Sequence, residues 1–89
     1  MKIRYSAQFK KDFKSIKRRG YDIELLEETI SLLSNGIRLP PKNRDHSLGG
    51  VYKGYRDCHI TPDWILIYRI EHDILTLILT RTGTHSDLF

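Results

Sequence analysis

Three of the four histidines in this 89-residue sequence stand outside the predicted helices, beside side chains that suit phosphate chemistry. His46 lies in a long loop, His59 near the end of a predicted strand, and His85 just after the last one. Histidine titrates near neutral pH, so it can act as a general base or a general acid. Asp63, in the turn after His59, is a carboxylate that could hold an imidazole in its required tautomer. RNA cleavage needs a base for the 2′-hydroxyl proton, an acid for the leaving 5′-oxygen and positive charge for the phosphorane, and this inventory meets that demand.

Cationic and aromatic side chains accompany the histidines along the chain. Guanidinium and ammonium groups bind phosphate, and exposed aromatic rings stack on nucleobases. The candidates for contact with RNA are Arg44, Lys53, Arg56, Trp64 and Arg81, and Phe89 follows His85 closely. Each type also has an ordinary structural use, because a strand arginine commonly pairs with a carboxylate and a tryptophan that opens a strand is commonly core. The sequence leaves both interpretations open.

Other kinds of site have little support. His46, Cys58, His59, Asp63 and His85 are metal-ligand types, but they lack the CxxC, HxxxH or HExxH spacing of known sites. We therefore predict no metal and no other cofactor. The sequence also contains no P-loop, GxGxxG or GxSxG motif, which leaves nucleotide hydrolysis and acyl transfer unsupported.

Two amphipathic helices are predicted in the first 36 residues. Apolar side chains recur at helical spacing in two sets: Tyr5, Phe9, Phe13 and Ile16, then Ile23, Leu26, Ile30 and Leu33. Ser6 and Asp22 are suitable N-caps, while Gly20 and Gly36 stand where the two helices should end. The pattern predicts a helical hairpin whose apolar stripes form core.

Strand-like runs dominate the remainder, after a loop at 37–50. They cover 51–60, 64–70 and 74–82, are joined by short turns, and follow a short strand at 2–5; His72 is expected to be a surface turn residue. We predict an α+β fold in a single domain over 1–89, in the order β-α-α-β-β-β. Its small antiparallel sheet carries the two N-terminal helices on one face.

The net charge of +4 is unevenly distributed. Residues 1–19 hold eight basic residues and one acid, a net +7, and residues 20–89 hold seven basic and ten acidic residues, a net −3. Such a basic segment either faces a polyanion or an acidic partner, or is a solvated helix face. A single cysteine, a charged N-terminus and the absence of a long apolar run indicate a cytoplasmic protein with no membrane association.

Several segments together resemble one family. They are YSAQFKKD at 5–12, HSLGG at 46–50, YKGYRDCHI at 52–60, PDWILIYRI at 62–70 and RTGTHSDLF at 81–89. They are similar to the YafQ-type toxins of the RelE/ParE superfamily of bacterial toxin–antitoxin modules, and the resemblance runs essentially from end to end.

The resemblance implies an endoribonuclease, an mRNA interferase that cleaves messenger RNA in the A site of the 30S ribosomal subunit and so inhibits translation. It places the acid–base group on His46, His59, Asp63 and His85, with Trp64 and Phe89 as supporting aromatics. It also implies a cognate antitoxin that holds the toxin inactive, and operator DNA as a partner of the toxin–antitoxin complex only. Contact with the ribosome, or with an acidic antitoxin segment, would fall on the basic residues of the first helix: Lys10, Lys11, Lys14, Lys17, Arg18 and Arg19.

Two other functions fit the same fold. One is a non-catalytic toxin that inhibits a protein target such as DNA gyrase, since one scaffold supports different functions. The other is a basic RNA- or ribosome-binding module whose histidines are structural. The histidine set favours the nuclease, because a pure binder does not need it.

Overall fold

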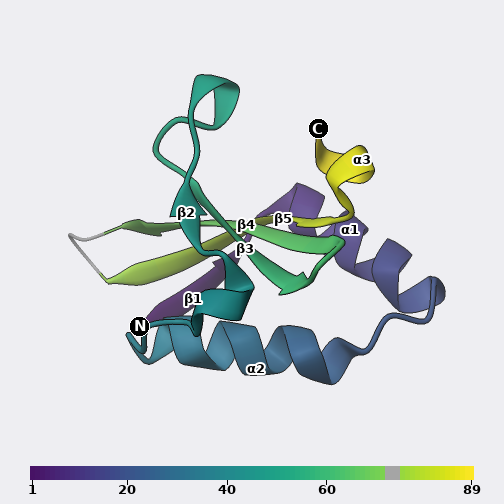
Figure 1. Cartoon of the computed structure of the whole chain (residues 1–89), viewed down its shortest axis with the longest axis horizontal. Coiled ribbons are helices and arrows are strands. Elements are labelled where there is room, and N and C mark those ends of the chain that lie inside the picture. Colours follow the sequence, from purple (N-terminus) through teal and green to yellow (C-terminus); the bar gives the residue numbers. More distant parts are fainter. Residues whose placement is uncertain (72–74) are drawn as a thin grey trace.

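The computed structural model describes residues 1–71 and 75–89, so the prediction for His72 lies outside the described residues. Figure 1 shows a five-stranded sheet with two long helices on one side and a short C-terminal helix on the other. In chain order the elements are β1 (Lys2–Tyr5), α1 (Ala7–Arg18), α2 (Ile23–Ser34), β2 (His46–Ser47), β3 (Arg56–Thr61), β4 (Trp64–Glu71), β5 (Thr76–Gly83) and α3 (His85–Leu88), with short 3-10 turns at Pro41–Asn43 and Gly50–Tyr52.

Both predicted helices form with the predicted caps. The Ser6 hydroxyl accepts a hydrogen bond from the Phe9 N–H at 2.9 Å, and the Asp22 carboxylate accepts one from the Glu24 N–H at 3.1 Å. These bonds satisfy backbone donors that the first turn of a helix leaves free. Gly20 adopts a φ of 80°, a left-handed conformation that favours glycine and ends the first helix.

The sheet has the strand order β1-β5-β4-β3-β2. All neighbours are antiparallel except β1 and β5, which pair in parallel with Ile3 opposite Leu77. The α+β prediction is therefore confirmed, and the sheet is mixed instead of purely antiparallel. The reason is that α1 and α2 return the chain to the far edge of the sheet, so β1 and β5 run the same way. The predicted loop at 37–50 also contains β2, which places His46 opposite Asp57.

Alternation along the strands divides the core between the two faces of the sheet. Leu66, Tyr68 and Leu79 pack with the helical stripes of α1 and α2. Ile65 and Ile67 point to the other face and pack with Leu88 of α3. The second cluster is small, and it supports the side of the sheet on which the histidines lie. Within the described residues, no helix has the length and apolar character needed to cross a membrane.

Candidate active site

A cavity of about 430 Å³ lies on the sheet face opposite α1 and α2. Its walls come from β2, β3, β4, the turn after β3 and the C-terminal segment. They consist of His46, Leu48, Asp57, His59, Pro62, Ile65, His85 and Phe89. The structure thus brings together the three histidines that the sequence singled out, together with Phe89.

His46 is held by a strained turn. Its Nδ1 lies 2.7 Å from the carbonyl oxygen of Arg44, which has a φ of 47° in the left-handed region. A carbonyl can only accept, so Nδ1 of the neutral ring carries the proton and Nε2 keeps its lone pair. Asn43 fixes this turn to β3, because its side-chain amide donates to the His59 carbonyl at 2.7 Å.

His59 is oriented in the same way by the turn that follows it. Its Nδ1 lies 3.2 Å from the carbonyl oxygen of Pro62, and this again places the proton of a neutral ring on Nδ1. Both rings therefore have Nε2 available to accept a proton. Backbone carbonyls orient them, a feature that residue types alone could not reveal.

Asp57 is a site residue that the sequence did not single out. Its carboxylate is only 4% exposed, and Oδ1 lies 3.2 Å from His46 Nδ1. That oxygen receives no hydrogen bond from the described residues, since the His46 N–H is used by the Arg44 carbonyl. Burial raises the pKa of Asp57, while His46, His59 and also His85 act to lower it. The buried carboxylate is thus the electrostatic neighbour of all three imidazoles.

His85 and Phe89 occupy the other side of the cavity, at the two ends of α3. Their ring centroids lie 5.0 Å apart, and Phe89 also contacts Tyr52 edge-to-face with a centroid separation of 5.7 Å. Phe89 is 57% exposed, so its ring remains available to a ligand. Tyr52, which the sequence did not mark, supports it from the 50–52 turn.

Asp63 is not among the residues that line this cavity. It is exposed in the turn between β3 and β4, one residue after Pro62. Among the described residues no hydrogen bond joins it to an imidazole, and the orienting acceptors are the Arg44 and Pro62 carbonyls. The expectation that Asp63 fixes a tautomer is therefore wrong for this structure, whereas a catalytic role for its exposed carboxylate stays a prediction.

The predicted phosphate-binding arginines differ in availability. Arg81 donates two hydrogen bonds to Asp12 of α1, at 3.0 and 3.1 Å, and these bonds raise its pKa. Arg56 lies 3.3 Å from Asp45. Arg44 is exposed and forms no ion pair within the described part of the chain. Lys53, which follows the 50–52 turn, is also exposed and also forms no ion pair there. Arg44 and Lys53 are thus the cations most free to meet a phosphate.

Trp64 corrects one prediction. It is 2% exposed, contacts Tyr21 edge-to-face at 5.0 Å, and donates its indole N–H to Thr82 at 2.8 Å. A ring enclosed on all sides cannot stack on a nucleobase, so the expectation that Trp64 contacts RNA is wrong. Its role is to hold the start of β4 against β5 and the helical hairpin.

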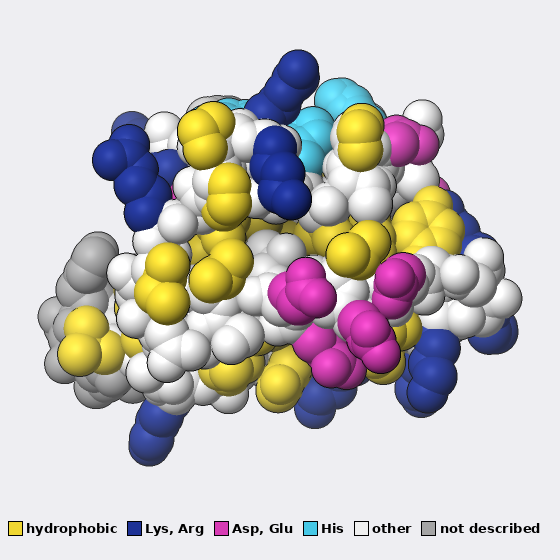
Figure 2. Space-filling view, turned by 60° about the horizontal axis from the view of Figure 1, so that its bottom comes forward, with side chains coloured by type: hydrophobic (Ala, Val, Ile, Leu, Met, Phe, Trp, Pro, Cys, Tyr) yellow, Lys and Arg dark blue, Asp and Glu magenta, His cyan; other side chains and the backbone are white. Residues whose placement is uncertain are grey.

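The basic side chains of α1 are exposed to solvent as predicted. Arg19 differs from the other basic residues because it is hydrogen-bonded within the chain. Its guanidinium donates to Asp87 at 3.0 Å and to the Tyr21 hydroxyl at 3.1 Å. The acidic residues gather elsewhere: Figure 2 shows Asp and Glu side chains clustered over the α2 side of the molecule. Asp22, Glu24, Glu27 and Glu28 are the exposed acids there.

No group of three or more His, Cys, Asp or Glu side chains within residues 1–71 and 75–89 is arranged to hold a metal ion. Cys58 is fully buried, and burial raises the pKa of its thiol. The thiolate form is therefore suppressed, which leaves Cys58 as a core residue.

Comparison with known proteins agrees with this geometry. The family described as the bacterial toxin of type II toxin–antitoxin systems, YafQ, matches residues 1–89. The mRNA interferase toxin YafQ of Escherichia coli K12 is 46% identical over 88 residues, which cover 98% of this chain and 94% of that protein.

Solved structures are equally similar. The E. coli DinJ–YafQ toxin–antitoxin complex contains a chain that is 45% identical, with a TM-score of 0.88, covering 98% of this chain and 94% of that one. A metal-bound toxin from Helicobacter pylori is 40% identical with a TM-score of 0.94, covering 100% of this chain and 99% of that one. This chain therefore belongs to the YafQ family of toxins from bacterial type II toxin–antitoxin systems.

Proposed function

We propose that this toxin cleaves messenger RNA in the A site of the 30S ribosomal subunit, by acid–base catalysis without a metal ion. The E. coli relative is named an mRNA interferase, a term for an endoribonuclease that cuts messenger RNA. The observation that carries the proposal is the convergence of three imidazoles and an exposed phenyl ring on one cavity. A toxin that only blocks a protein target has no need of such a set.

His46 and His59 are the candidate general bases. Their Nδ1 atoms face carbonyl oxygens, so Nε2 of either neutral ring can take the 2′-hydroxyl proton. The 2′-oxygen then attacks phosphorus and the bond to the 5′-oxygen breaks, which leaves a 2′,3′-cyclic phosphate and a 5′-hydroxyl. A positive charge that forms on His46 lies beside the buried Asp57 carboxylate, which stabilises it.

His85 is the candidate general acid for the 5′-oxygen. Neither of its ring nitrogens is engaged in a hydrogen bond with the described residues, and it lines the cavity opposite His46 and His59. Phe89 stacks on a base beside the cut, while Arg44 and Lys53 meet the phosphates. Asp63 contributes a further carboxylate once RNA is bound.

The His85→Ala variant tests this function. We expect cleavage of ribosome-bound mRNA to fall by about 10²–10⁴-fold, with circular dichroism and antitoxin affinity unchanged. Primer extension on mRNA translated by purified ribosomes measures the cuts. Translation arrest by the wild-type chain with intact mRNA would refute the nuclease and favour a non-catalytic toxin.

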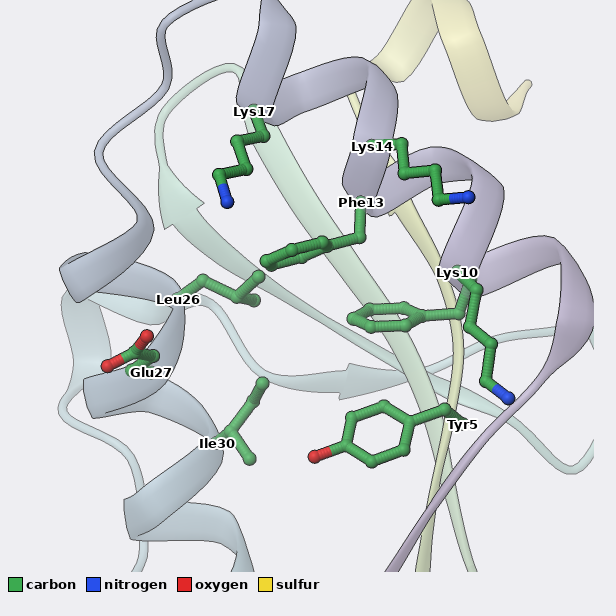
Figure 3. A pocket seen from close by; sticks show the side chains of 9 residues that line it. Tyr5, Lys10, Phe13, Lys14, Lys17, Leu26, Glu27 and Ile30 are labelled. Carbon is green, nitrogen blue, oxygen red and sulfur yellow. The ribbon is translucent and has the colours of Figure 1, made fainter.

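The proposed protein partner is a cognate antitoxin, because the similar E. coli toxin is found in a complex with one. A groove of about 590 Å³ between α1 and α2 offers a docking place, shown in Figure 3. Its apolar lining comes from both helices and β1: Tyr5, Phe9, Phe13, Leu26 and Ile30. Lys10, Lys14 and Lys17 flank the α1 side and Glu27 the α2 side.

This charge pattern specifies the occupant: an antitoxin segment with an apolar stripe and acidic side chains beside the lysines. Since the same lysines are the candidate contacts to ribosomal RNA, the bound segment would also mask ribosome docking. Lys11 and Arg18 complete the proposed ribosome-facing set, and the toxin–antitoxin complex is the species expected to bind operator DNA. Since ribosomes and mRNA are cytoplasmic, the proposed function implies a cytoplasmic location.

Replacing Lys10, Lys14 and Lys17 together by Gln tests the shared surface. We expect weaker antitoxin and ribosome binding, with a smaller dependence of each on salt, because three positive charges are lost. An unchanged salt dependence for both partners would show that these lysines only contact solvent.

A further inference from the structure

The catalytic turn at the C-terminus is too short to be stable by itself. α3 has only four residues, and an isolated helix of one turn is strongly unfavourable in water. Yet this turn carries both His85 and Phe89 into the cavity. Contacts with the rest of the chain must therefore hold it.

The Asp87 carboxylate accepts two of the hydrogen bonds that hold this turn. Asp87 Oδ2 accepts a hydrogen bond from the Thr84 N–H at 2.8 Å, and the Thr84 hydroxyl accepts one from the Asp87 N–H at 3.1 Å. This reciprocal capping box closes the turn. The same Oδ2 accepts a second hydrogen bond from Arg19, at the end of α1, at 3.0 Å. Asp87 therefore links the turn to a helix 68 residues away in sequence.

Gly83 provides the space for this carboxylate. It is the last residue of β5 and pairs with Ile65, so the sheet fixes its backbone. A Cβ at this position would lie 3.0 Å from both Cβ and Oδ2 of Asp87, tighter than nine in ten Cβ contacts in proteins, so Asp87 would have to shift by a few tenths of an ångström. Leu88 anchors the opposite side of the turn, where it is 7% exposed against Ile65 and Ile67.

The ion pair between Arg19 and Asp87 contributes little to stability, but a small displacement of the turn has a large effect on the rate. The side chains of Arg19 and Asp87 are 39% and 38% exposed, so solvent screens their ion pair and the pair adds little to folding. Geometry is more sensitive, since a catalytic group displaced by about 1 Å can lose about 10²-fold in rate.

We propose that Asp87 is a positioning residue for His85, that Arg19 is its partner on α1, and that Gly83 is needed for the space beside it. This inference rests on the proposed catalytic role of His85. It gives Arg19 a function other than ribosome contact, unlike the rest of the basic face of α1.

Four variants test the assignment in ribosome-dependent cleavage: Asp87→Ala, Asp87→Asn, Arg19→Gln and Gly83→Ala. Arg38→Gln is the matched control for the lost positive charge, because Arg38 is exposed and belongs to neither site. We expect Asp87→Ala to lower kcat by about 10–100-fold and Gly83→Ala to lower it by a smaller factor, with KM within about twofold and Tm within a few degrees of wild type for both. Asp87→Asn should lose less, because its amide oxygen can still accept from Thr84.

A double-mutant cycle is a sharper test, because it measures whether Asp87 and Arg19 act through each other. Once Asp87 has become Ala, adding Arg19→Gln should lower kcat no further, because Arg19 has already lost its acceptor, whereas two independent residues would give multiplied losses. NMR supplies a readout apart from activity: the ring-current shift between His85 and Phe89 should collapse in Asp87→Ala and persist in Arg38→Gln.

The outcomes separate this inference from the proposed function. If the wild-type chain does not cut ribosome-bound mRNA, the function fails, while the NMR comparison still tests the positioning. If the wild type cuts and Asp87→Ala retains its kcat and ring-current shift, the positioning role is refuted and the function stands.

Discussion

Replacing Asp57 by Asn should impair cleavage without weakening the fold. The substitution keeps the shape of a side chain that is 4% exposed and removes its charge. When His46 takes the 2′-hydroxyl proton, the imidazolium lies 3.2 Å from Asp57 Oδ1. An opposite charge at such a distance stabilises a charged group by about 1.4–4 kcal/mol, which corresponds to about 10–10³-fold in rate. Since 54% of the His46 side chain is exposed, solvent screens this interaction, and we expect a loss of rate near the lower end of that range, about 10–30-fold.

The cleavage rate of Asp57→Asn should fall, but its free energy of unfolding should not. Burial raises the pKa of Asp57 above its unfolded value, so the folded chain binds this proton more tightly than the unfolded chain. The wild type therefore loses stability as pH rises through the titration of this carboxyl group. Asn does not titrate, and Asp57→Asn should be at least as stable as wild type at pH 7, with less advantage at pH 4.

The assay is single-turnover cleavage of ribosome-bound mRNA at constant Mg²⁺, with thermal unfolding followed by circular dichroism at both pH values. Glu28→Gln is the control, because it removes one negative charge from the exposed face of α2. Wild-type cleavage by Asp57→Asn would refute the electrostatic role. A large loss of stability at pH 7 would show that the carboxylate is a structural requirement instead.

Three further predictions concern the core, the α1–β5 connection and metals. Trp64→Phe removes the indole donor to Thr82 and part of the core volume, so urea unfolding should show a loss of about 2–4 kcal/mol with kcat within about twofold; a selective loss of RNA binding would contradict the buried role. Asp12→Ala leaves the Arg81 guanidinium and the Thr82 N–H without their acceptor, and unfolding measurements should show a loss of about 2–4 kcal/mol; a smaller loss than that of Asp22→Ala would contradict it. Chelators selective for copper and zinc, at constant Mg²⁺, should leave cleavage by the wild type unchanged, whereas inhibition reversed by adding one of these metals would contradict metal-independent catalysis.

Local patterns predicted the helices and most of the strands. Apolar spacing and the caps Ser6 and Asp22 were sufficient for α1 and α2, because these signals act within a few residues. The positions of His46, His59 and His85 in loops and at strand ends allowed them to meet at one end of the sheet, and the structure brings them to one cavity.

What the sequence could not predict depends on register and on distant partners. Asp57 looks like an ordinary strand residue until the pairing of β2 with β3 puts it opposite His46. Arg81 is held by Asp12, 69 residues away, and no local pattern reports such a pair. Trp64 could have stacked on RNA or filled the core, and only the packing of α1 and α2 decides for the core. The Thr84–Asp87 capping box, by contrast, was visible in the spacing of the two residues.

The central claim is that three imidazoles cut mRNA in the ribosomal A site. Its most direct test is to map the cut and identify the new ends on mRNA held by a ribosome with a defined codon in an open A site. We expect a cut at that codon with a 2′,3′-cyclic phosphate and a 5′-hydroxyl, lost in His85→Ala and blocked when cognate tRNA fills the site. Equal cutting of free mRNA, or 5′-phosphate ends, would contradict it.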